Sequence, residues 1–144
     1  MSKVEPLRLL AEDADDLAVI SAALQDAVAK VGDLEWDAKG RRFTLAVNRF
    51  RWEAPGVLLS ERVRAGLQFG SVMAVKSRNL RRAPPDAVVE LLAVSFEPAE
   101  TPGGDIRLAF AGGGDLVLTV ECVDAALADI SPPWPTSSTP AHQE

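Results

Sequence analysis

The sequence predicts an α+β fold: a mainly antiparallel rolled sheet or partly open barrel of about seven strands, with one long N-terminal helix and one short C-terminal helix. Apolar residues alternate with polar ones in several runs between residues 33 and 122, and the connections between the runs are short and contain Gly or Pro. Helical spacing occurs near each end of the chain, over 17–31 and 123–130. Strands that follow one another through tight turns favour an antiparallel sheet, with helices on one face or at one open end.

A chain of 144 residues with 47% apolar and 25% charged residues has the size and balance of one globular domain. We predict this domain over residues 1–131, followed by a disordered Pro/Ser-rich tail over 132–144 with Trp134 as its only anchor. No apolar run reaches the roughly 18 residues of a membrane span. No secretory signal precedes the acidic run at Glu12, so we expect a cytoplasmic protein.

The N-terminal region predicts a brief strand and then the long helix. Leu7–Leu10 is strand-like, and the Asp13 carboxylate can cap the helix by accepting hydrogen bonds from backbone N–H groups two or three residues later. Apolar residues then recur at helical spacing from Leu17 to Val31, and Gly32 ends the pattern. The prediction is a helix of about five turns at 3.6 residues each.

Four runs with strand character follow this helix. They cover residues 33–38, 42–53, 62–76 and 88–96. In the second run the apolar positions change from odd at Val47 to even at Phe50, which requires either a β-bulge or burial of both faces. We favour a bulge near Asn48–Arg49, because Arg49 and Arg51 would otherwise point towards the core.

The clearest structural signal is a hairpin near the C-terminus. Ile106–Phe110 and Leu116–Cys122 both alternate, and Gly112–Asp115 supplies the turn between them. Val123, Leu127 and Ile130 then follow at spacings of four and three. We therefore expect the second strand to lead directly into the short C-terminal helix.

Few residues of the chain are suited to catalysis or metal binding. His142 is the only histidine and lies in the predicted tail, so we expect no Ser-His-Asp or Cys-His mechanism and no His-ligated zinc. Cys122 is the only cysteine, which excludes an intrachain disulfide and favours an inert core thiol. The sequence predicts no catalytic residue, no cofactor and no metal site.

Two further patterns suggest ligands but favour a structural interpretation. Asp33, Glu35 and Asp37 share one face of a strand, where they could hold a hard cation or form a solvated face paired with arginines. Strand residues two apart lie about 6.5 Å from each other, which favours the solvated face. The glycine clusters at 102–104 and 112–114 each lead into a strand that begins with an aspartate, so they indicate turns and not phosphate loops.

Charge is distributed unevenly along the chain. The net charge is −6, but the segment Lys39–Arg82 contains eleven basic and two acidic residues. A basic sheet face of this kind could bind an acidic protein surface, RNA or a nucleotide. The alternative is that the arginines pair with nearby carboxylates such as Asp33, Glu35 and Asp37 within the fold.

The segments LRLLAEDADDLAVISAALQDAVAKVGDLEWDAKGRRFTLAVNRFRWE, RVRAGLQFGSVMAVKSRNL, ELLAVSF and FAGGGDLVLTVECVDAALADI, in this order, resemble a family of small uncharacterised bacterial proteins, a domain of unknown function. The resemblance extends from Leu7 to about Pro140. It implies a compact intracellular protein and supplies no activity, cofactor or catalytic residue.

The function predicted from the sequence is that of a non-enzymatic protein-interaction or assembly module with a basic sheet face. Nucleic-acid or nucleotide binding through Lys39–Arg82 is the less favoured alternative, and a small carboxylate-dependent enzyme is the third. The partner is an unidentified protein, no membrane is involved, and the edges of such a sheet also allow a homodimer. The candidate contact face comprises Arg49, Arg51, Arg62, Arg64, Arg78, Arg81 and Arg82.

Overall fold

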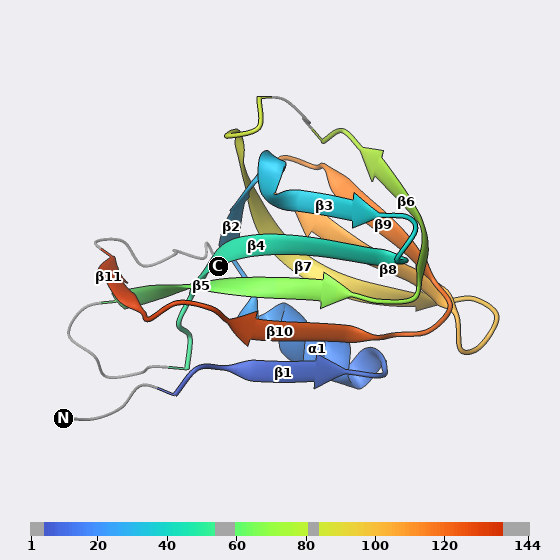
Figure 1. Ribbon diagram of the computed structural model, residues 1–144, viewed down its shortest axis with the longest axis horizontal. Helices are drawn as coiled ribbons and strands as arrows, with labels where there is room; N and C mark the ends of the chain where they lie inside the picture. Colours follow the sequence, from blue (N-terminus) through green and yellow to red (C-terminus); the bar gives the residue numbers. More distant parts are fainter. Residues whose placement is uncertain (1–4, 54–59, 81–83, 137–144) are drawn as a thin grey trace.

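The computed structural model describes residues 5–53, 60–80 and 84–136. These residues form one open sheet of eleven strands and a single α-helix (Figure 1). The elements are β1 (Arg8–Ala11), α1 (Ala14–Ala23), β2 (Ala27–Lys30), the 3₁₀ turn η1 (Val31–Asp33), β3 (Leu34–Asp37), β4 (Arg42–Phe50), β5 (Ser60–Phe69), β6 (Val72–Arg78), β7 (Val88–Pro98), β8 (Gly104–Phe110), β9 (Asp115–Val120), β10 (Ala125–Asp129) and β11 (Trp134–Thr136).

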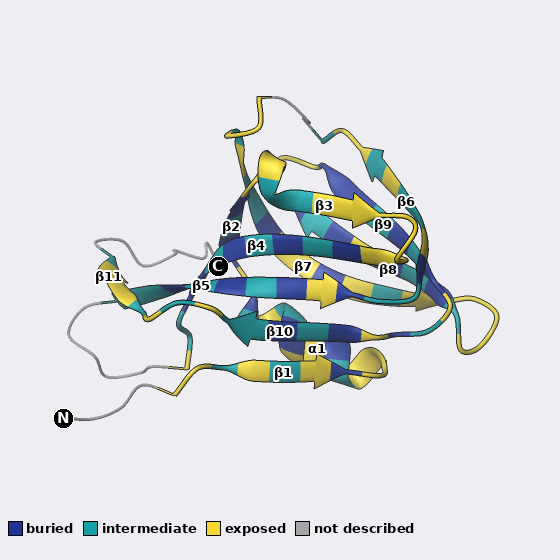
Figure 2. Cartoon of the chain, viewed as in Figure 1, coloured by how far each residue is buried: buried dark blue, intermediate teal, exposed yellow. Residues whose placement is uncertain are grey.

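The strand order in the sheet is β1-β10-β5-β4-β2-β7-β8-β9-β6, while β3 pairs with β4 and β11 pairs with β5. Every ladder is antiparallel, as predicted, but the predicted α+β class with two helices on a rolled sheet or partly open barrel is wrong, because the described residues are mostly strand in one open sheet with a single helix. Figure 1 shows β1, β10, β5, β4 and β3 in front of β7, β8 and β9. Buried residues, dark blue in Figure 2, occur on strands of both halves, and their side chains form one apolar cluster. We call the face of the front half that points away from this cluster its outer face.

The predicted long N-terminal helix is wrong in its second half. α1 has ten residues, its Asp13 cap is formed, and Leu24 is its C-cap. Asp26 then takes a φ of 65°, which ends the helical path, and Ala27–Lys30 becomes β2 by pairing with β7. Short apolar runs fit a helix and a strand equally well, so pairing with neighbouring strands decides between them.

The predicted C-terminal helix is also wrong. Residues Ala125–Asp129 form β10, which lies between β1 and β5 and pairs with both. Ala125 and Leu127 are buried, while Ala126 and Ala128 lie on the outer face. Ala and Leu have high helix propensity, but two ladders and a buried alternating face outweigh it here.

The predicted count of about seven strands is too low for the described residues. β2 and β10 replace predicted helical segments, and the predicted strand 62–76 divides at Gly70–Ser71 into β5 and β6. β11 occupies residues 134–136 within the predicted tail, and residues 137–144 lie outside the described residues. The predicted hairpin is confirmed as β8 and β9, with Gly112 and Gly113 at φ of 91° and 95° in its turn.

The expected bulge near Asn48–Arg49 is wrong as well. The β4–β5 ladder keeps one register from Phe43 opposite Phe69 to Phe50 opposite Arg62. Odd residues of β4 therefore face the interior along the whole strand, and Arg49 lies among them with 0% exposure. Phe50 is shielded on the outer face by Trp52, whose ring centroid is 4.5 Å away, and by the Arg62 guanidinium at 6.0 Å.

Candidate functional site

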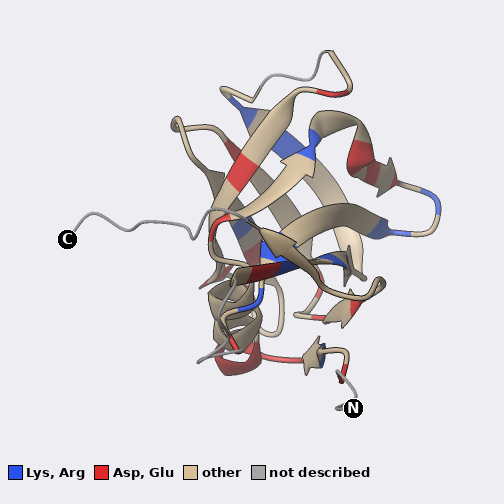
Figure 3. Ribbon diagram, turned by 90° about the vertical axis from the view of Figure 1, so that its left-hand side faces the viewer, with Lys and Arg blue, Asp and Glu red and all other residues tan. Residues whose placement is uncertain are grey.

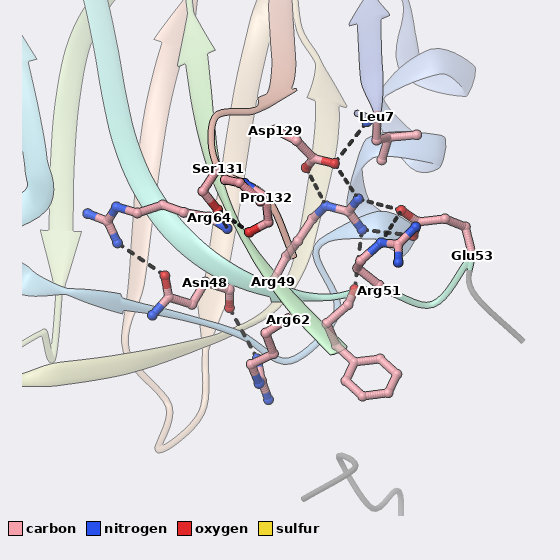
Figure 4. Close-up of polar contacts among 11 residues, drawn as sticks. Leu7, Asn48, Arg49, Arg51, Glu53, Arg62, Arg64, Asp129, Ser131 and Pro132 are labelled. Carbon is pink, nitrogen blue, oxygen red and sulfur yellow. Dashed lines mark hydrogen bonds and ion pairs between the residues drawn. The ribbon is translucent and has the colours of Figure 1, made fainter. Parts of the chain in front are cut away.

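A buried arginine is the most unusual feature of the interior. Arg49 is on β4 and contacts Asp129 of β10 and Glu53, four residues later in the chain (Figure 4). Its Nε and Nη2 donate to the two carboxylate oxygens of Asp129, both at 2.9 Å. Its Nη1 and Nη2 donate to Glu53 at 2.9 and 2.5 Å, and Nη1 also donates to the Phe50 carbonyl. The guanidinium has five N–H groups, and these five contacts use its whole donor capacity.

A second arginine extends this cluster towards solvent. Arg51 forms an ion pair with Glu61 and lies 3.8 Å from Glu53. A hollow of about 710 Å³ opens beside it, lined by Pro6, Arg51, Glu61, Val63, Asp129, Ile130, Ser131, Pro132 and Pro133. Polar groups at this hollow come from segments far apart in the sequence. The Asp129 carboxylate also accepts a hydrogen bond from the Leu7 backbone N–H at 2.8 Å.

The electrostatics of the cluster favour fixed charges over proton transfer. The Arg49 guanidinium holds the pKa of the Glu53 carboxyl below its usual range, with burial opposing this effect. Burial lowers the pKa of Arg49, but its bonds to the two carboxylates outweigh burial and raise that pKa above its ordinary value. A general acid needs a carboxyl whose pKa is raised towards neutral pH, which is the opposite of the environment of Glu53. The cluster is therefore suited to holding together three segments of the chain: β4 with Glu53, β10, and the segment at Leu7.

Two other arginines of the predicted contact face lie on the outer face of β5. Arg62 donates to the backbone carbonyl of Asn48 at 3.1 Å. Arg64 donates to the Asn48 side-chain oxygen at 3.2 Å and forms an ion pair with Asp33 at 3.0 Å. Pairing of the acidic residues with arginines, one of the predicted alternatives, is observed at Asp33 and for Asp37 with Arg42.

Arg78 lies on another part of the sheet, at the end of β6. It donates to both carboxylate oxygens of Asp115 on β9, at 3.1 and 2.8 Å. Arg107 of β8 contacts the same carboxylate at 2.7 Å. These two arginines lower the pKa of Asp115 to about 2.

The structure thus divides the predicted contact face among three places. Arg49 and Arg51 belong to the ion-pair cluster, Arg62 and Arg64 to the outer face of β5, and Arg78 to β6. Arg81 and Arg82 lie outside the described residues. In the view of Figure 3, basic and acidic segments are interspersed over the sheet. Most of the described arginines contact a carboxylate of a neighbouring segment.

The outer face of β10, β5 and β4 carries a trough. Ala128, Gly66 and Ala46 are opposite one another in the β10–β5 and β5–β4 ladders, so three very small residues form one row across the strands. A Cβ built on Gly66 meets nothing within 4 Å. The hollow over this row measures about 440 Å³ and is lined by Gly32, Asp33, Glu35, Thr44, Leu45, Ala46, Gly66, Leu67, Gln68, Ala126 and Ala128.

Residues on either side of this row form the walls of the trough. Arg64 and Asn48 lie opposite each other along one side. Gln68 and Thr44 lie opposite each other along the other side, with Glu35 next to Thr44 on β3. The charged residues of the lining are Asp33 and Glu35, and Arg64 lies beside the trough, paired with Asp33.

An apolar cleft lies on the other side of β3. It measures about 330 Å³ and is bounded by β3 and β4 on one side and by β6 and β9 on the other. Trp36, at 38% exposure, is part of its wall. Its lining contains no charged side chain and consists of Val31, Leu34, Trp36, Phe43, Val75, Leu80 and Leu116.

Residues singled out for chemistry lie away from these surfaces. Cys122, expected on the buried face of a strand, follows the end of β9, is half-buried and lies 3.8 Å from the Ser71 hydroxyl. His142 lies outside the described residues. Within the described residues, no group of three His, Cys, Asp or Glu side chains is arranged to hold a metal ion. Nor does that part of the chain contain a helix with the length and apolarity needed to span a bilayer.

Sequence reasoning missed the two aspartates that organise the arginines. Asp129 falls in the predicted C-terminal helix, and Asp115 is the last residue of the predicted turn. The available signal was Arg49 itself, because an arginine in phase with buried residues of a strand requires a buried acidic partner. The partner could not be named, since it lies 80 residues away in the sequence.

Comparison with known proteins is consistent with the predicted resemblance. No curated protein and no solved structure matches this chain. A family model matches residues 7–142, which is nearly the whole chain and close to the extent predicted from the sequence. The chain therefore belongs to the family described as a protein of unknown function, DUF2948.

Proposed function

We propose that this protein is a non-catalytic interaction module that binds another protein through the trough on the outer face of β10, β5 and β4. The observation that carries the proposal is the row Ala128, Gly66 and Ala46, which lets a partner approach the sheet backbone closely. α1 packs on β7 and β1, so it does not cover this row. A place in the cytoplasm is part of the same proposal.

The walls of the trough indicate the chemistry of the partner. A narrow apolar ridge on the surface of the partner would fit the small residues that form the floor of the trough. The charged residues of the lining are Glu35 and Asp33, of which Asp33 is paired with Arg64, so a basic side chain on the flank of the ridge would face Glu35. Charge-assisted pairing at these walls would contribute orientation more than affinity.

Filling the trough tests this proposal without disturbing the core. Gly66→Arg adds a long side chain where the surroundings are open, and Ala93→Arg adds the same side chain on exposed β7 as a matched control. A protein isolated with the wild-type chain should then be titrated against both purified variants. We expect G66R to weaken its binding at least about tenfold, a change of 1.4 kcal/mol, and A93R to leave it unchanged. Equal binding by wild type and G66R would overturn the proposal.

Nucleic-acid binding remains the alternative for Lys39–Arg82. The ion pairs of Arg49, Arg51, Arg64 and Arg78 reduce the positive charge available to phosphates, which favours the protein partner. Labelled RNA and DNA in a salt titration separate the two hypotheses. A protein that makes 6–10 phosphate contacts loses roughly 10³–10⁵ in affinity between about 50 and 200 mM salt. Tight, steeply salt-dependent binding would support the nucleic-acid alternative.

The apolar cleft between β3 and β6 favours a second candidate function, binding of an uncharged small molecule. Its volume of about 330 Å³ and its apolar lining are within the range of ligand pockets. The neutral dye N-phenyl-1-naphthylamine, which fluoresces in apolar surroundings, should bind saturably. Val75→Trp should abolish this binding, whereas Val117→Trp on the opposite face of β9 should preserve it. Dye binding unaffected by V75W would exclude the cleft as the site.

A carboxylate-dependent enzyme, the third function considered, has the least support. Asp129 and Glu53 both share the Arg49 guanidinium, and this contact lowers the pKa of Glu53. A carboxylate held in its ionised form stabilises positive charge but does not deliver protons at neutral pH.

A further inference from the structure

We infer that two copies of this chain pair through β1, antiparallel to one another, about a two-fold axis at Leu10. β1 is the first strand in the sheet order, and of the described strands it pairs with β10 alone. Leu10 is 76% exposed, more than any other large hydrophobic side chain in the described part of the chain. An edge strand with an exposed leucine is a template for a further strand.

The direction of the backbone groups shows which residues can make the new hydrogen bonds. The Asp129 N–H donates to the Leu7 carbonyl at 3.0 Å, and the register places Leu7 opposite Asp129. Hydrogen-bonded residues alternate along an antiparallel strand, so Leu9 and Ala11 also bond towards β10. The N–H and C=O groups of Arg8 and Leu10 therefore point to the free edge. At the axis, Leu10 can exchange two backbone hydrogen bonds with Leu10 of a second copy.

This register makes the side chains self-complementary. With Leu10 opposite its own copy, Arg8 of each chain lies opposite Glu12 of the other, so two identical ion pairs flank one apolar contact. Arg8 and Leu10 are alternate exposed residues of β1, and Glu12, also exposed, is the residue directly after the strand, where its N–H donates to the Asp16 carboxylate at 3.1 Å. Arg8 and Leu10 lie on the outer face, because they are opposite Ala128 and Ala126. Opposite charges facing each other across two strands stabilise a pair, and like charges destabilise it.

The other end of the strand order lacks this complementarity. β6 carries Lys76 and Arg78 on the same face as Ala74. Symmetric pairing about Lys76 would place two lysines opposite each other. Each Arg78 would lie opposite Ala74 of the other copy, next to this pair of lysines. Like charges directly opposite oppose association, and lysine on an edge strand is a common protection against pairing. Of the two ends of the strand order, β1 is therefore the edge suited to self-association.

A dimer of this form also has a geometric consequence for the trough. A two-fold axis perpendicular to the sheet at the paired edges joins the two sheets into one and keeps both outer faces on the same side. Arg8 continues the row of Ala128, Gly66 and Ala46 at the edge, so the two troughs would approach one another across the axis. The dimer is argued from β1 alone and does not depend on a partner in the trough.

Sedimentation equilibrium of the full chain tests the association. We expect the wild type to show twice the chain mass of 15.4 kDa. Leu10→Lys should give a monomer, whereas Met73→Lys, which places the same charge at a position 57% exposed on β6, should remain dimeric. Both side chains are exposed, so both variants should keep the wild-type circular dichroism spectrum.

Charge exchange tests the register itself. Arg8→Glu puts two carboxylates opposite each other at each flanking pair, and Glu12→Arg puts two guanidinium groups there. Each single variant should therefore raise the dimer dissociation constant about tenfold, a change of 1.4 kcal/mol spread over two pairs. The double variant R8E/E12R should restore dimerisation, and mixing the two single variants should produce a heterodimer.

Two outcomes would overturn the inference: a wild type that stays monomeric up to about 1 mM, or a dimer that Leu10→Lys leaves intact. Failure of the double variant R8E/E12R to recover would overturn the register.

Discussion

Arg49 of β4 and Asp129 of β10 form a two-bond ion pair across β5, the strand that lies between them. Their side chains are 0% and 3% exposed. The pair connects β4, in the middle of the chain, to β10. The Asp129 carboxylate also accepts a hydrogen bond from the backbone N–H of Leu7, just before β1. A charged pair in this position holds three distant segments in one arrangement.

Removal of one partner measures how much this ion pair contributes to the free energy of unfolding. Arg49→Leu leaves Asp129 buried without its cation, and the free energy of unfolding should fall by about 3 kcal/mol, measured by urea denaturation. Arg64→Leu is the matched control: its pair with Asp33 is more than a third exposed, so its loss should be about 1 kcal/mol or less. The double variant Arg49→Leu/Asp129→Leu should recover part of the loss, because the fully buried carboxylate is then gone and Glu53, 37% exposed, keeps Arg51 at 3.8 Å. Equal losses for R49L and R64L would contradict a bracing role.

Asp115 should make stability depend on acid pH. Arg78 and Arg107 lower its pKa in the folded protein to about 2, from the ordinary value of 3.8. The unfolded chain takes up this proton first as pH falls, so the stabilisation is complete above about pH 4 and is lost as pH falls through about 2. Asp115→Asn should remove this part of the pH dependence.

Urea denaturation at several pH values between about 5 and 2 checks the effect, and NMR titration of the Asp115 carboxyl carbon should give a midpoint near 2. A midpoint at the ordinary value would show that the two arginines do not hold Asp115 in solution.

The glycines at positions 66 and 113 should respond oppositely to alanine. Gly113 has a φ of 95°, so Gly113→Ala should destabilise the hairpin by about 1–2 kcal/mol. Gly66 has open space around its Cβ position and lies within β5, so Gly66→Ala should stabilise the protein by about 0.5 kcal/mol. Thermal unfolding of both variants distinguishes the two effects. A loss at Gly66 as large as that at Gly113 would contradict the open trough.

The cap of α1 gives a further measurable contribution. The Asp13 carboxylate accepts a hydrogen bond from the Asp16 N–H at 2.8 Å, in the position expected from the sequence. Asp13→Ala should lower the free energy of unfolding by about 1 kcal/mol, measured by urea denaturation. Asp13→Asn keeps the acceptor and should lose much less. If D13N and D13A were equally destabilised, the charge and not the hydrogen bond would carry the effect.

Local patterns predicted the parts of the fold whose signals are local. The β8–β9 hairpin depends on alternation and a glycine turn, and the start of α1 depends on Asp13, so both could be predicted within a few residues. The segments 27–30 and 125–129 could not. Ala-rich runs fit both helix and strand, and the choice came from pairing with β7, or with β1 and β5, which the sequence alone does not specify.

The candidate site was predictable only in its residue types. The sequence identified an excess of arginine between 39 and 82 and named carboxylate pairing as an alternative. It does not place Arg49 inside, because an arginine avoids the core unless a buried carboxylate pairs with it, and no local pattern indicates that carboxylate. Its partners Glu53 and Asp129 lie 4 and 80 residues later in the chain, and only the register of β4, β5 and β10 brings Asp129 to Arg49.

The position of β10 between β1 and β5 bears on how the protein emerges from the ribosome. β1 is translated before the other described strands, yet its partner in the sheet, residues 125–129, is translated after nearly all of them. Until β10 leaves the exit tunnel, the backbone of Leu9 therefore lacks its hydrogen-bonding partner, and the β1 segment of the nascent chain stays unpaired with β10. Completion of this edge of the sheet consequently follows the synthesis of β2 to β9 and does not precede it.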